Sequence, residues 1–252
     1  MLAGVVSLSL QIGVNYANDY SDGVRGTDDV RVGPVRLVAS GLASPAAVKR
    51  AALVALAVAA ISGFALAALT TWWLLGIGAA ALVAAWTYTG GPRPYGYAGL
   101  GEVFVFVFFG LVATVGTEYA VATRITLTGV VASIAVGCFA CALLVVNNLR
   151  DIPTDVAAGK RTLAVRLGDA ATRRFLAVLV VVAAAAVIAT GFTADVWALG
   201  GLIGVFATKP ALDAVARGAR GRDLIAVLGV IGRAQMVLGV TYAVGLAVSL
   251  TR

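Results

Sequence analysis

The sequence contains no histidine and few charged residues. Without histidine, the chain lacks the usual near-neutral general base and a common metal ligand. Only 12% of the 252 residues are charged, whereas 61% are hydrophobic, and the mean hydropathy is +0.98. Because a soluble domain has roughly 45–50% apolar residues, this composition excludes an ordinary soluble protein. It predicts an integral membrane protein whose outer surface is solvated by lipid.

Cysteine is also scarce, with Cys138 and Cys141 the two examples. The same spacing in a soluble protein would suggest a redox pair. Here both residues lie in an apolar run, where we expect them to pack as small apolar side chains.

Long hydrophobic runs are abundant, each about as long as a helical span and without the alternation of barrel strands. The first is short and starts at Met1 without a basic flank, so it does not resemble a signal peptide. We expect an all-α, polytopic transmembrane helical bundle, with residues 1–252 forming a single domain of about eight helices. The eight segments are 2–18, 47–69, 72–90, 101–120, 125–148, 173–191, 196–216 and 224–250.

The basic residues indicate an orientation. If the segments alternate in direction, every Lys and Arg except Arg124 and Arg252 belongs to loops on the same side, and that side is predicted to be cytosolic. With eight segments, both termini then lie outside. The net charge of +7 is interpreted as topology and as contact with anionic lipid headgroups. Nucleic-acid binding is not indicated, because no basic stripe with interleaved aromatics is present.

Two acidic clusters follow apolar runs on the predicted cytosolic side. In NYANDYSD, the residues Asn15, Asp19 and Asp22 are spaced i, i+4, i+7, so a helix would place them on one face. Ionisable groups within or beside membrane spans are costly, and are therefore candidates for function.

The second cluster, NNLRDIPTD, repeats this arrangement with Asn147, Asp151 and Asp155 at i, i+4, i+8. Pro153 lies inside it and removes a helical hydrogen bond, so we expect the helix to kink or end near Asp151.

Four such aspartates suggest a cation site. A structural carboxylate would have an Arg or Lys on its own face, whereas clustered carboxylates repel one another until a cation neutralises them. Oxygen ligands suit Mg²⁺, which commonly binds one or two carboxylates together with substrate phosphates. Two Mg²⁺ ions could therefore hold a diphosphate as a leaving group. Nearby basic residues suited to phosphate oxygens are Arg25, Arg93, Arg150, Lys160 and Arg161.

The loop over residues 88–102 is rich in Gly and Pro and carries Tyr88, Tyr95 and Tyr97. Its length is typical of an ordered cap, which we place over the cytosolic mouth. The tyrosines could face a planar or cationic group, or could form an aromatic belt at the membrane interface.

These motifs resemble those of the UbiA superfamily of intramembrane prenyltransferases. NDYSD (18–22) is similar to the start of its NDxxDxxxD motif, and RDIPTD (150–155) to the DxxxD part of its second motif. Gly26 and Gly159 replace the third aspartates, and Asp28 follows. These replacements are similar to the motifs of one branch of the superfamily, which prenylates 1,4-dihydroxy-2-naphthoate in menaquinone biosynthesis. Two longer strings resemble the same branch, YTGGPRPYGYAGLGE and NNLRDIPTDVAAGKRT.

The resemblance implies a nine-helix bundle around a central cavity, of which the first helix has no counterpart here. Two interpretations are open: a shortened chain, or a shorter active form. It further implies a multi-pass protein of the cell inner (plasma) membrane, with its active site facing the cytoplasm.

The implied reaction joins a polyprenyl diphosphate to an aromatic acid acceptor, 1,4-dihydroxy-2-naphthoate, with loss of diphosphate and CO₂ to give demethylmenaquinone. Two Mg²⁺ ions and a catalytic role are implied for Asp19, Asp22, Asp151 and Asp155. The implied substrate-binding residues are Asn15, Asn18, Arg25, Tyr88, Arg93, Tyr95, Asn147, Arg150 and Lys160.

Three other functions are considered. Another aromatic acceptor would leave the chemistry unchanged. A CDP-alcohol phosphotransferase would share D19-Y-S-D22-G23, but residues 26 and 27 are Gly-Thr rather than Ala-Arg. An ion-coupled transporter would need a polar path through the spans, whereas both clusters lie at one end of their segments.

Overall fold

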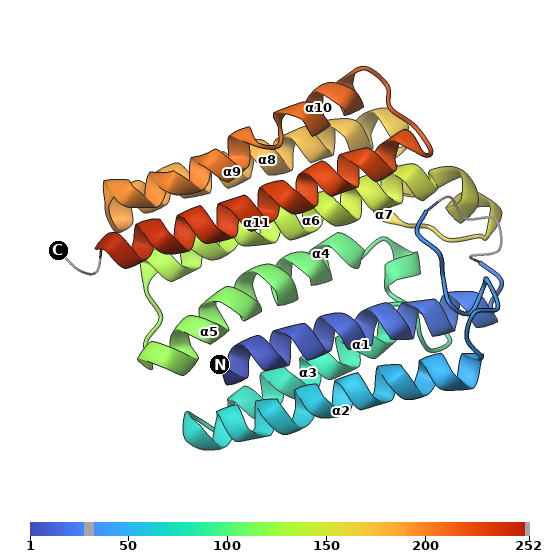
Figure 1. Ribbon diagram of the computed structural model, residues 1–252, viewed down its shortest axis with the longest axis horizontal. Helices are drawn as coiled ribbons and strands as arrows, with labels where there is room; N and C mark the ends of the chain where they lie inside the picture. The colour runs from blue at the N-terminus through green and yellow to red at the C-terminus, as the bar shows by residue number, and fades with distance from the viewer. Residues whose placement is uncertain (28–32, 250–252) are drawn as a thin grey trace. The chain divides into compact units, whose positions relative to one another are not determined.

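The computed structural model describes residues 1–27 and 33–249, and this part of the chain forms helices without a strand. The predicted all-α fold is confirmed, and each of the eight apolar segments is mostly helical over its described residues (Figure 1). A few residues used in the sequence analysis lie outside the described residues: the end of the eighth segment, Asp28, Asp29, Arg31 and Arg252.

The chain divides into two compact units, the first made of Met1–Gly101 and Thr154–Thr162 and the second of Glu102–Pro153 and Leu163–Arg252. Whether the chain behaves as the single predicted domain stays a prediction.

In the first unit, helices α1 (Leu2–Val24), α2 (Pro45–Leu69) and α3 (Leu74–Thr87) lie side by side (Figure 1). Helix α1 approaches α2 closely at Gly13, where an added Cβ would lie 2.7 Å from the Leu56 side chain. Glycine therefore permits the close packing that places the acidic end of α1 in this unit.

Two local signals explain where α2 begins. The Ser44 hydroxyl accepts a hydrogen bond from the Ala47 N–H at 3.3 Å, which caps the helix N-terminus. Pro45 follows at the first helical position, where its fixed φ suits the helix and its missing N–H costs nothing.

The second unit begins with one apolar rod made of α4 (Gly101–Val105), the π-helical η2 (Phe106–Val112) and α5 (Ala113–Ala122). The long helix α6 (Leu127–Ala157) follows. The remaining elements are α7 (Leu163–Leu167), α8 (Asp169–Thr193), η3 (Val196–Gly201), α9 (Leu202–Phe206), α10 (Lys209–Ala216) and α11 (Asp223–Ser249). The first unit also contains a short 3₁₀ turn, η1 (Gly96–Ala98).

The core of the second unit lies where α6, α8 and α11 meet. Phe139, Leu176, Ile231 and Leu238 are each at most 1% exposed there. The rod packs tightly on α6, because an added Cβ at Gly110 would lie 2.5 Å from the Gly137 Cα.

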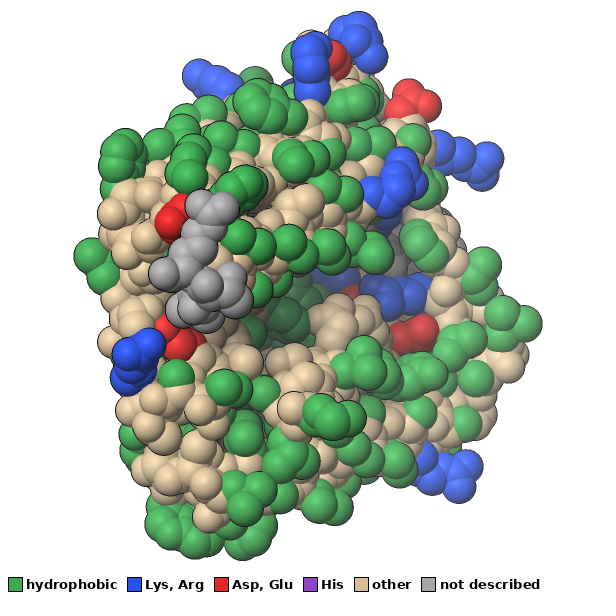
Figure 2. Space-filling view, turned by 60° about the vertical axis from the view of Figure 1, so that its left-hand side comes forward, with side chains coloured by type: hydrophobic (Ala, Val, Ile, Leu, Met, Phe, Trp, Pro, Cys, Tyr) green, Lys and Arg blue, Asp and Glu red, His purple; other side chains and the backbone are tan. Residues whose placement is uncertain are grey.

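The surface of the helices is apolar. Among the described residues, six helices are long and apolar enough to cross a membrane, and α3 is a shorter apolar helix. Large side chains such as Phe192 and Val121 are more than 80% exposed. Hydrophobic side chains are spread over the whole face in Figure 2, and the Lys and Arg side chains stand at separate places, mostly along its edges. This surface suits lipid, and the chain is a multi-pass membrane protein.

Three sequence-based boundaries need correction. Helix α1 extends beyond residue 18 to Val24, so the first acidic cluster is helical. Helix α6 runs through Pro153 to Ala157, so the expectation that it ends near Asp151 is wrong, and a kink there stays a prediction. Proline lacks an N–H and so removes one backbone hydrogen bond to the preceding turn. The loss of this one bond does not prevent the helix from continuing for one more turn, to Ala157. Arg233 lies within α11 rather than in a loop.

Candidate active site

Asp19 anchors a loop to α1. The side chain is buried, and its two carboxylate oxygens accept the N–H groups of Leu37 and Val38 at 2.9 and 3.0 Å. Gly23 lets this loop approach, since a Cβ there would lie 2.5 Å from the Val38 side chain. Both oxygens of Asp19 are therefore already used within the protein, although each keeps further acceptor capacity.

Asp22, one turn further along α1, meets Tyr97 and Lys160. The Tyr97 hydroxyl donates a hydrogen bond to Asp22 Oδ1, and Lys160 Nζ lies 3.4 Å from the same oxygen. Both charged side chains are less than 10% exposed. Asp22 Oδ2 accepts no hydrogen bond from the residues that the structure describes, so half of this carboxylate remains available.

Tyr97 also has two cations against its ring. The Lys160 Nζ lies 4.7 Å from the ring centroid, and the Arg25 Cζ lies 5.4 Å from it. Arg25 donates to the carbonyls of Thr89 and Gly91 as well, which ties the end of α1 to the 88–100 loop. The Tyr97 ring thus binds two cationic side chains next to the Asp22 carboxylate.

The segment after α6 completes this cluster within the first unit. The Arg161 N–H donates to the Tyr97 carbonyl at 2.9 Å, and the Lys160 N–H donates to the Asp155 carbonyl at 2.8 Å. The buried Asp155 carboxylate accepts from the Thr162 hydroxyl at 3.3 Å. The first acidic motif and the segment that follows the second therefore meet at Tyr97.

The tyrosine hydroxyls are shielded from water. Burial raises the pKa of Tyr97, the charge and hydrogen bond of Asp22 raise it further, and Lys160 and Arg25 act in the opposite direction. Burial likewise raises the pKa of Tyr95, whose hydroxyl donates to the Ala84 carbonyl at 2.9 Å. Both phenols therefore remain protonated hydrogen-bond donors at neutral pH.

In the second unit, Asp151 is paired with its neighbour on α6. The Arg150 guanidinium donates to both Asp151 oxygens at 2.6 and 2.7 Å, and to Asn147 Oδ1 at 2.6 Å. The expectation that clustered carboxylates lack a basic partner is therefore wrong for Asp151, as it is for Asp22. Adjacent residues of a helix point in different directions, but the long Arg150 side chain bends along the helix and reaches the Asp151 carboxylate.

Some predicted residues lie apart from the Tyr97 cluster. Asn15 is exposed and donates to the Gln11 carbonyl of its own helix at 2.8 Å. Arg93 is exposed in the 88–100 loop. Tyr88 packs edge-on against Tyr95, with ring centroids 5.4 Å apart. Asn18 accepts from the Thr89 hydroxyl at 2.8 Å and so supports the loop that Arg25 contacts.

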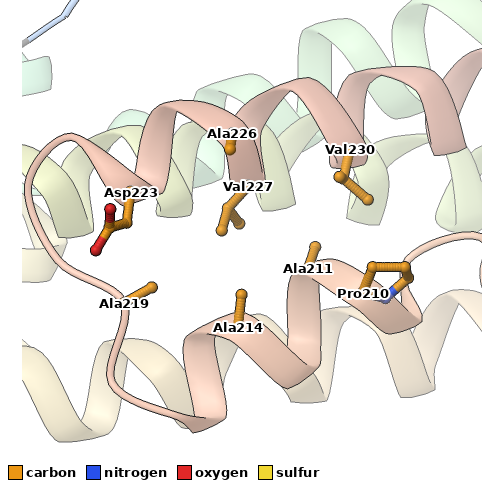
Figure 3. A pocket seen from close by; sticks show the side chains of 8 residues that line it. All are labelled: Pro210, Ala211, Ala214, Ala219, Asp223, Ala226, Val227 and Val230. Atoms are coloured by element: carbon orange, nitrogen blue, oxygen red, sulfur yellow. The ribbon is translucent and has the colours of Figure 1, made fainter.

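An apolar groove between α10 and α11 contains none of the motif residues (Figure 3). Its lining is small and aliphatic except for one carboxylate, and the side chains point toward one another across the gap between the two helices. They are Pro210, Ala211, Ala214, Ala219, Asp223, Ala226, Val227 and Val230.

Comparison with known proteins agrees with this arrangement. The model of the UbiA prenyltransferase family matches residues 1–228, which include both acidic motifs and the 88–102 loop. The chain belongs to this family. The prediction from the motifs is confirmed.

Relatives of this UbiA family member share a name. This chain is 50% identical to the 1,4-dihydroxy-2-naphthoate octaprenyltransferase of Mycobacterium tuberculosis. The match covers 98% of this chain and 84% of the relative. The Mycobacterium leprae protein of that name is 49% identical over 96% of this chain and 82% of the relative. The Escherichia coli protein is 37% identical over 71% of the chain and 60% of the relative.

The donor set suits Mg²⁺ in its chemistry. Within the described ranges, no three acidic or cysteine side chains lie close enough together to hold a metal by themselves. Mg²⁺ does not need three, because it is commonly held by one or two carboxylates plus waters and phosphate oxygens. Asp22 Oδ2, which accepts no hydrogen bond from the described residues, is an oxygen ligand of the required kind.

Sequence reasoning missed two residues of this UbiA protein. Glu102 is buried at the start of α4, and its Oε1 accepts from Asn148 Nδ2 at 2.9 Å. The sequence held one usable signal, which was an acidic residue at the beginning of an apolar span. For Asn148, the sequence shows only that it follows Asn147. That position does not reveal whether its side chain binds a carboxylate or simply packs in the core.

Proposed function

We propose that this protein transfers a polyprenyl group from polyprenyl diphosphate to 1,4-dihydroxy-2-naphthoate, releasing diphosphate and CO₂ and giving demethylmenaquinone. One observation carries the proposal: the chain is 50% identical, over nearly all of its length, to a relative with this named acceptor. The Tyr97 cluster supports it, because carboxylate, phenol, lysine and arginine groups meet there.

The diphosphate is proposed to bind at this cluster. Lys160 and Arg25 carry positive charge next to the Tyr97 ring, and Lys160 Nζ is only 3.4 Å from Asp22. Both cations can donate to phosphate oxygens, and the buried position of Lys160 strengthens its interaction with an anion.

Mg²⁺ is proposed as the cofactor, held by Asp22 and by Asp155, which lies on the final turn of α6. When bound, the metal would neutralise charge developing on the departing diphosphate. Asp151, one turn earlier on α6, is proposed to share this role, with Arg150 fixing the orientation of its carboxylate. Asp19 instead holds the 37–38 loop against α1.

The chain's own residues then prepare the transfer. Tyr97 holds Asp22 by its hydroxyl and the two cations by its ring, so carboxylate and cations keep a set spacing. The apolar spans offer the prenyl tail an environment like the lipid from which it comes. The concentration of Lys and Arg on one side of the predicted topology leads us to place the site at the cytoplasmic face of the plasma membrane.

The test is product analysis on purified protein in detergent. A panel of polyprenyl diphosphates and aromatic acids is offered with and without Mg²⁺, and prenylated products are identified by mass spectrometry. We expect a prenylated naphthoate and equivalent diphosphate release, both dependent on Mg²⁺. Prenylation of a different aromatic acid alone would refute the acceptor, and transfer in the presence of a chelator would refute the cofactor.

The carboxylate assignment has its own variants. Asp22→Asn and Asp155→Asn should each lower kcat by at least about 10²-fold, because each removes an anionic oxygen from the proposed metal site. Asp213→Asn, on the exposed surface of α10, is the control and should retain activity. Near-wild-type turnover in both site variants would contradict the assignment.

A further inference from the structure

Glu102 is a buried acid whose hydrogen bonding is only half complete. The residue is 5% exposed, and Asn148 occupies Oε1. Oε2 is buried and has no hydrogen-bond partner within the described part of the chain. A buried acceptor without a partner is costly, so a structural role alone explains it poorly.

The position of Glu102 is imposed by its surroundings. The Cys141 thiol lies 3.2 Å from the Glu102 carbonyl, and the Gly110–Gly137 contact holds the same rod against α6 one to two turns further along. The rod includes the π-helical η2, a feature often found near functional sites. The carboxylate is thus fixed against α6 rather than free to rotate toward water.

Helix α6 relates Glu102 to the second acidic motif. Asn148, its partner, precedes Asp151 by three residues, so the two share a face about 4.5 Å apart along the axis. In the predicted topology, Asn148 lies on the membrane-interior side of Asp151. Glu102, held by Asn148, therefore lies on the membrane-interior side of the second acidic motif within the same unit.

We propose that Glu102 is the general base of prenyl transfer and takes the proton of the acceptor's ring hydroxyl. This rests on the proposed function, which supplies an acceptor with such a hydroxyl. Oε2 accepts the hydroxyl hydrogen, and Asn148 holds Oε1 so that Oε2 keeps its direction. Glu102 is a catalytic residue in this scheme, and Asn148 is a positioning residue.

The proton and electrons balance in one transfer. The hydroxyl O–H bond breaks, its proton passes to Glu102 Oε2, and the oxygen becomes a ring carbonyl as its electron pair moves into the ring. A ring carbon forms the new C–C bond to the first carbon of the prenyl group. The bond from that carbon to oxygen breaks, and its electron pair leaves with the diphosphate.

The test compares wild type with Glu102→Gln, which keeps the shape and removes the base. General bases contribute roughly 10²–10⁴-fold, so kcat should fall by at least about 10²-fold. KM for the polyprenyl diphosphate should change little, because the donor is held elsewhere. Glu118→Gln, in the same apolar rod and hydrogen-bonded to Thr126, is the matched control and should stay within about twofold of wild type.

A series of acceptors distinguishes a base from a structural support. Electron-withdrawing ring substituents make the hydroxyl more acidic, and an ionised hydroxyl needs no base. The ratio of wild-type to Glu102→Gln rates should therefore shrink steadily as acceptor acidity rises. Changes in ring nucleophilicity affect both proteins and cancel in the ratio. A constant ratio, or wild-type kcat in Glu102→Gln, would overturn the proposal.

Folding and the parent function are controlled separately. Gel filtration in detergent checks each variant. Should Glu102→Gln not fold, Glu102→Asp replaces it: this shorter base should reduce kcat to a smaller extent, and its deficit should likewise shrink as acceptor acidity rises, whereas a constant deficit would refute the assignment. If the wild type prenylates no naphthoate, the proposed function itself fails. If it does and the acidity ratio is constant, only the role of Glu102 fails.

Discussion

Gly110 is the position where one methyl group should most disturb the packing of the rod on α6. A Cβ added there would lie 2.5 Å from the Gly137 Cα, 3.0 Å from its N and 3.1 Å from the Ser133 carbonyl oxygen. All three atoms belong to the α6 backbone, so no side chain can rotate away. Ordinary contact begins at 3.4 Å, so Gly110→Ala must separate the helices by close to 1 Å or distort the π-helix.

Overpacking of this kind costs about 1–3 kcal/mol. That corresponds to a fall in Tm of several degrees for a chain of this size. The Glu102–Asn148 hydrogen bond belongs to the same contact and should lengthen, so kcat should fall as well. Thermal unfolding in detergent and single-turnover product formation measure the two effects.

Gly116→Ala is the matched control, because it lies in the same rod with nothing within 4 Å of its added Cβ. Alanine favours helix over glycine by about 1 kcal/mol, so this variant should be unchanged or slightly more stable. Equal Tm values for the two alanine variants would show that the Gly110 contact is not tight in the folded protein.

The remaining predictions concern the Tyr97 cluster. Tyr97→Phe keeps the ring and its cations but loses the hydrogen bond to Asp22, which should lower the free energy of unfolding by about 1.5–3 kcal/mol. Because the pKa of Tyr97 is raised, this contribution is complete below its ordinary pKa of about 10 and is lost as pH rises through the raised value. The difference in Tm between wild type and Tyr97→Phe should therefore be constant from about pH 6 to 9 and should decrease only above about pH 10. A decrease of this difference near neutral pH would contradict the prediction. Asp19→Asn weakens two backbone hydrogen bonds and should lower Tm more than Asp22→Asn does, and the reverse order would refute the anchoring role of Asp19.

The spacing of polar residues predicted one buried face of α1, and this prediction is correct only for the turns of the helix that a loop covers. The i, i+4, i+7 spacing places Asn15 with Asp19 and Asp22, yet Asn15 is exposed and the two aspartates are buried. The difference arises because Leu37, Val38 and Tyr97 reach only the last turns of the helix. Which turns a loop covers depends on contacts between residues up to 75 positions apart, and spacing along one helix carries no information about them.

The ion pairs show a second limit. Membership of the two acidic motifs was readable from residue type and spacing, but their partners were not. Lys160 reaches Asp22 across 138 residues of chain, because the segment after α6 turns back and bonds to Tyr97. The pairing of Arg150 with Asp151 depends on a rotamer. Residue chemistry thus indicated the kind of site, and tertiary contacts decided how each charge is compensated.

That compensation is incomplete at Lys160. Charge-assisted N–H···O contacts are typically about 2.7–2.9 Å long, as between Arg150 and Asp151, whereas Lys160 stays 3.4 Å from Asp22. The Tyr97 ring, 4.7 Å away, attracts the ammonium without neutralising it. Asp22 is similarly divided, because its Oδ1 receives the phenol and the lysine while Oδ2 accepts no hydrogen bond from the described residues. A cation and a carboxylate that are only partly satisfied by each other can both turn to an anionic ligand and its metal, and this is the property that a diphosphate site requires.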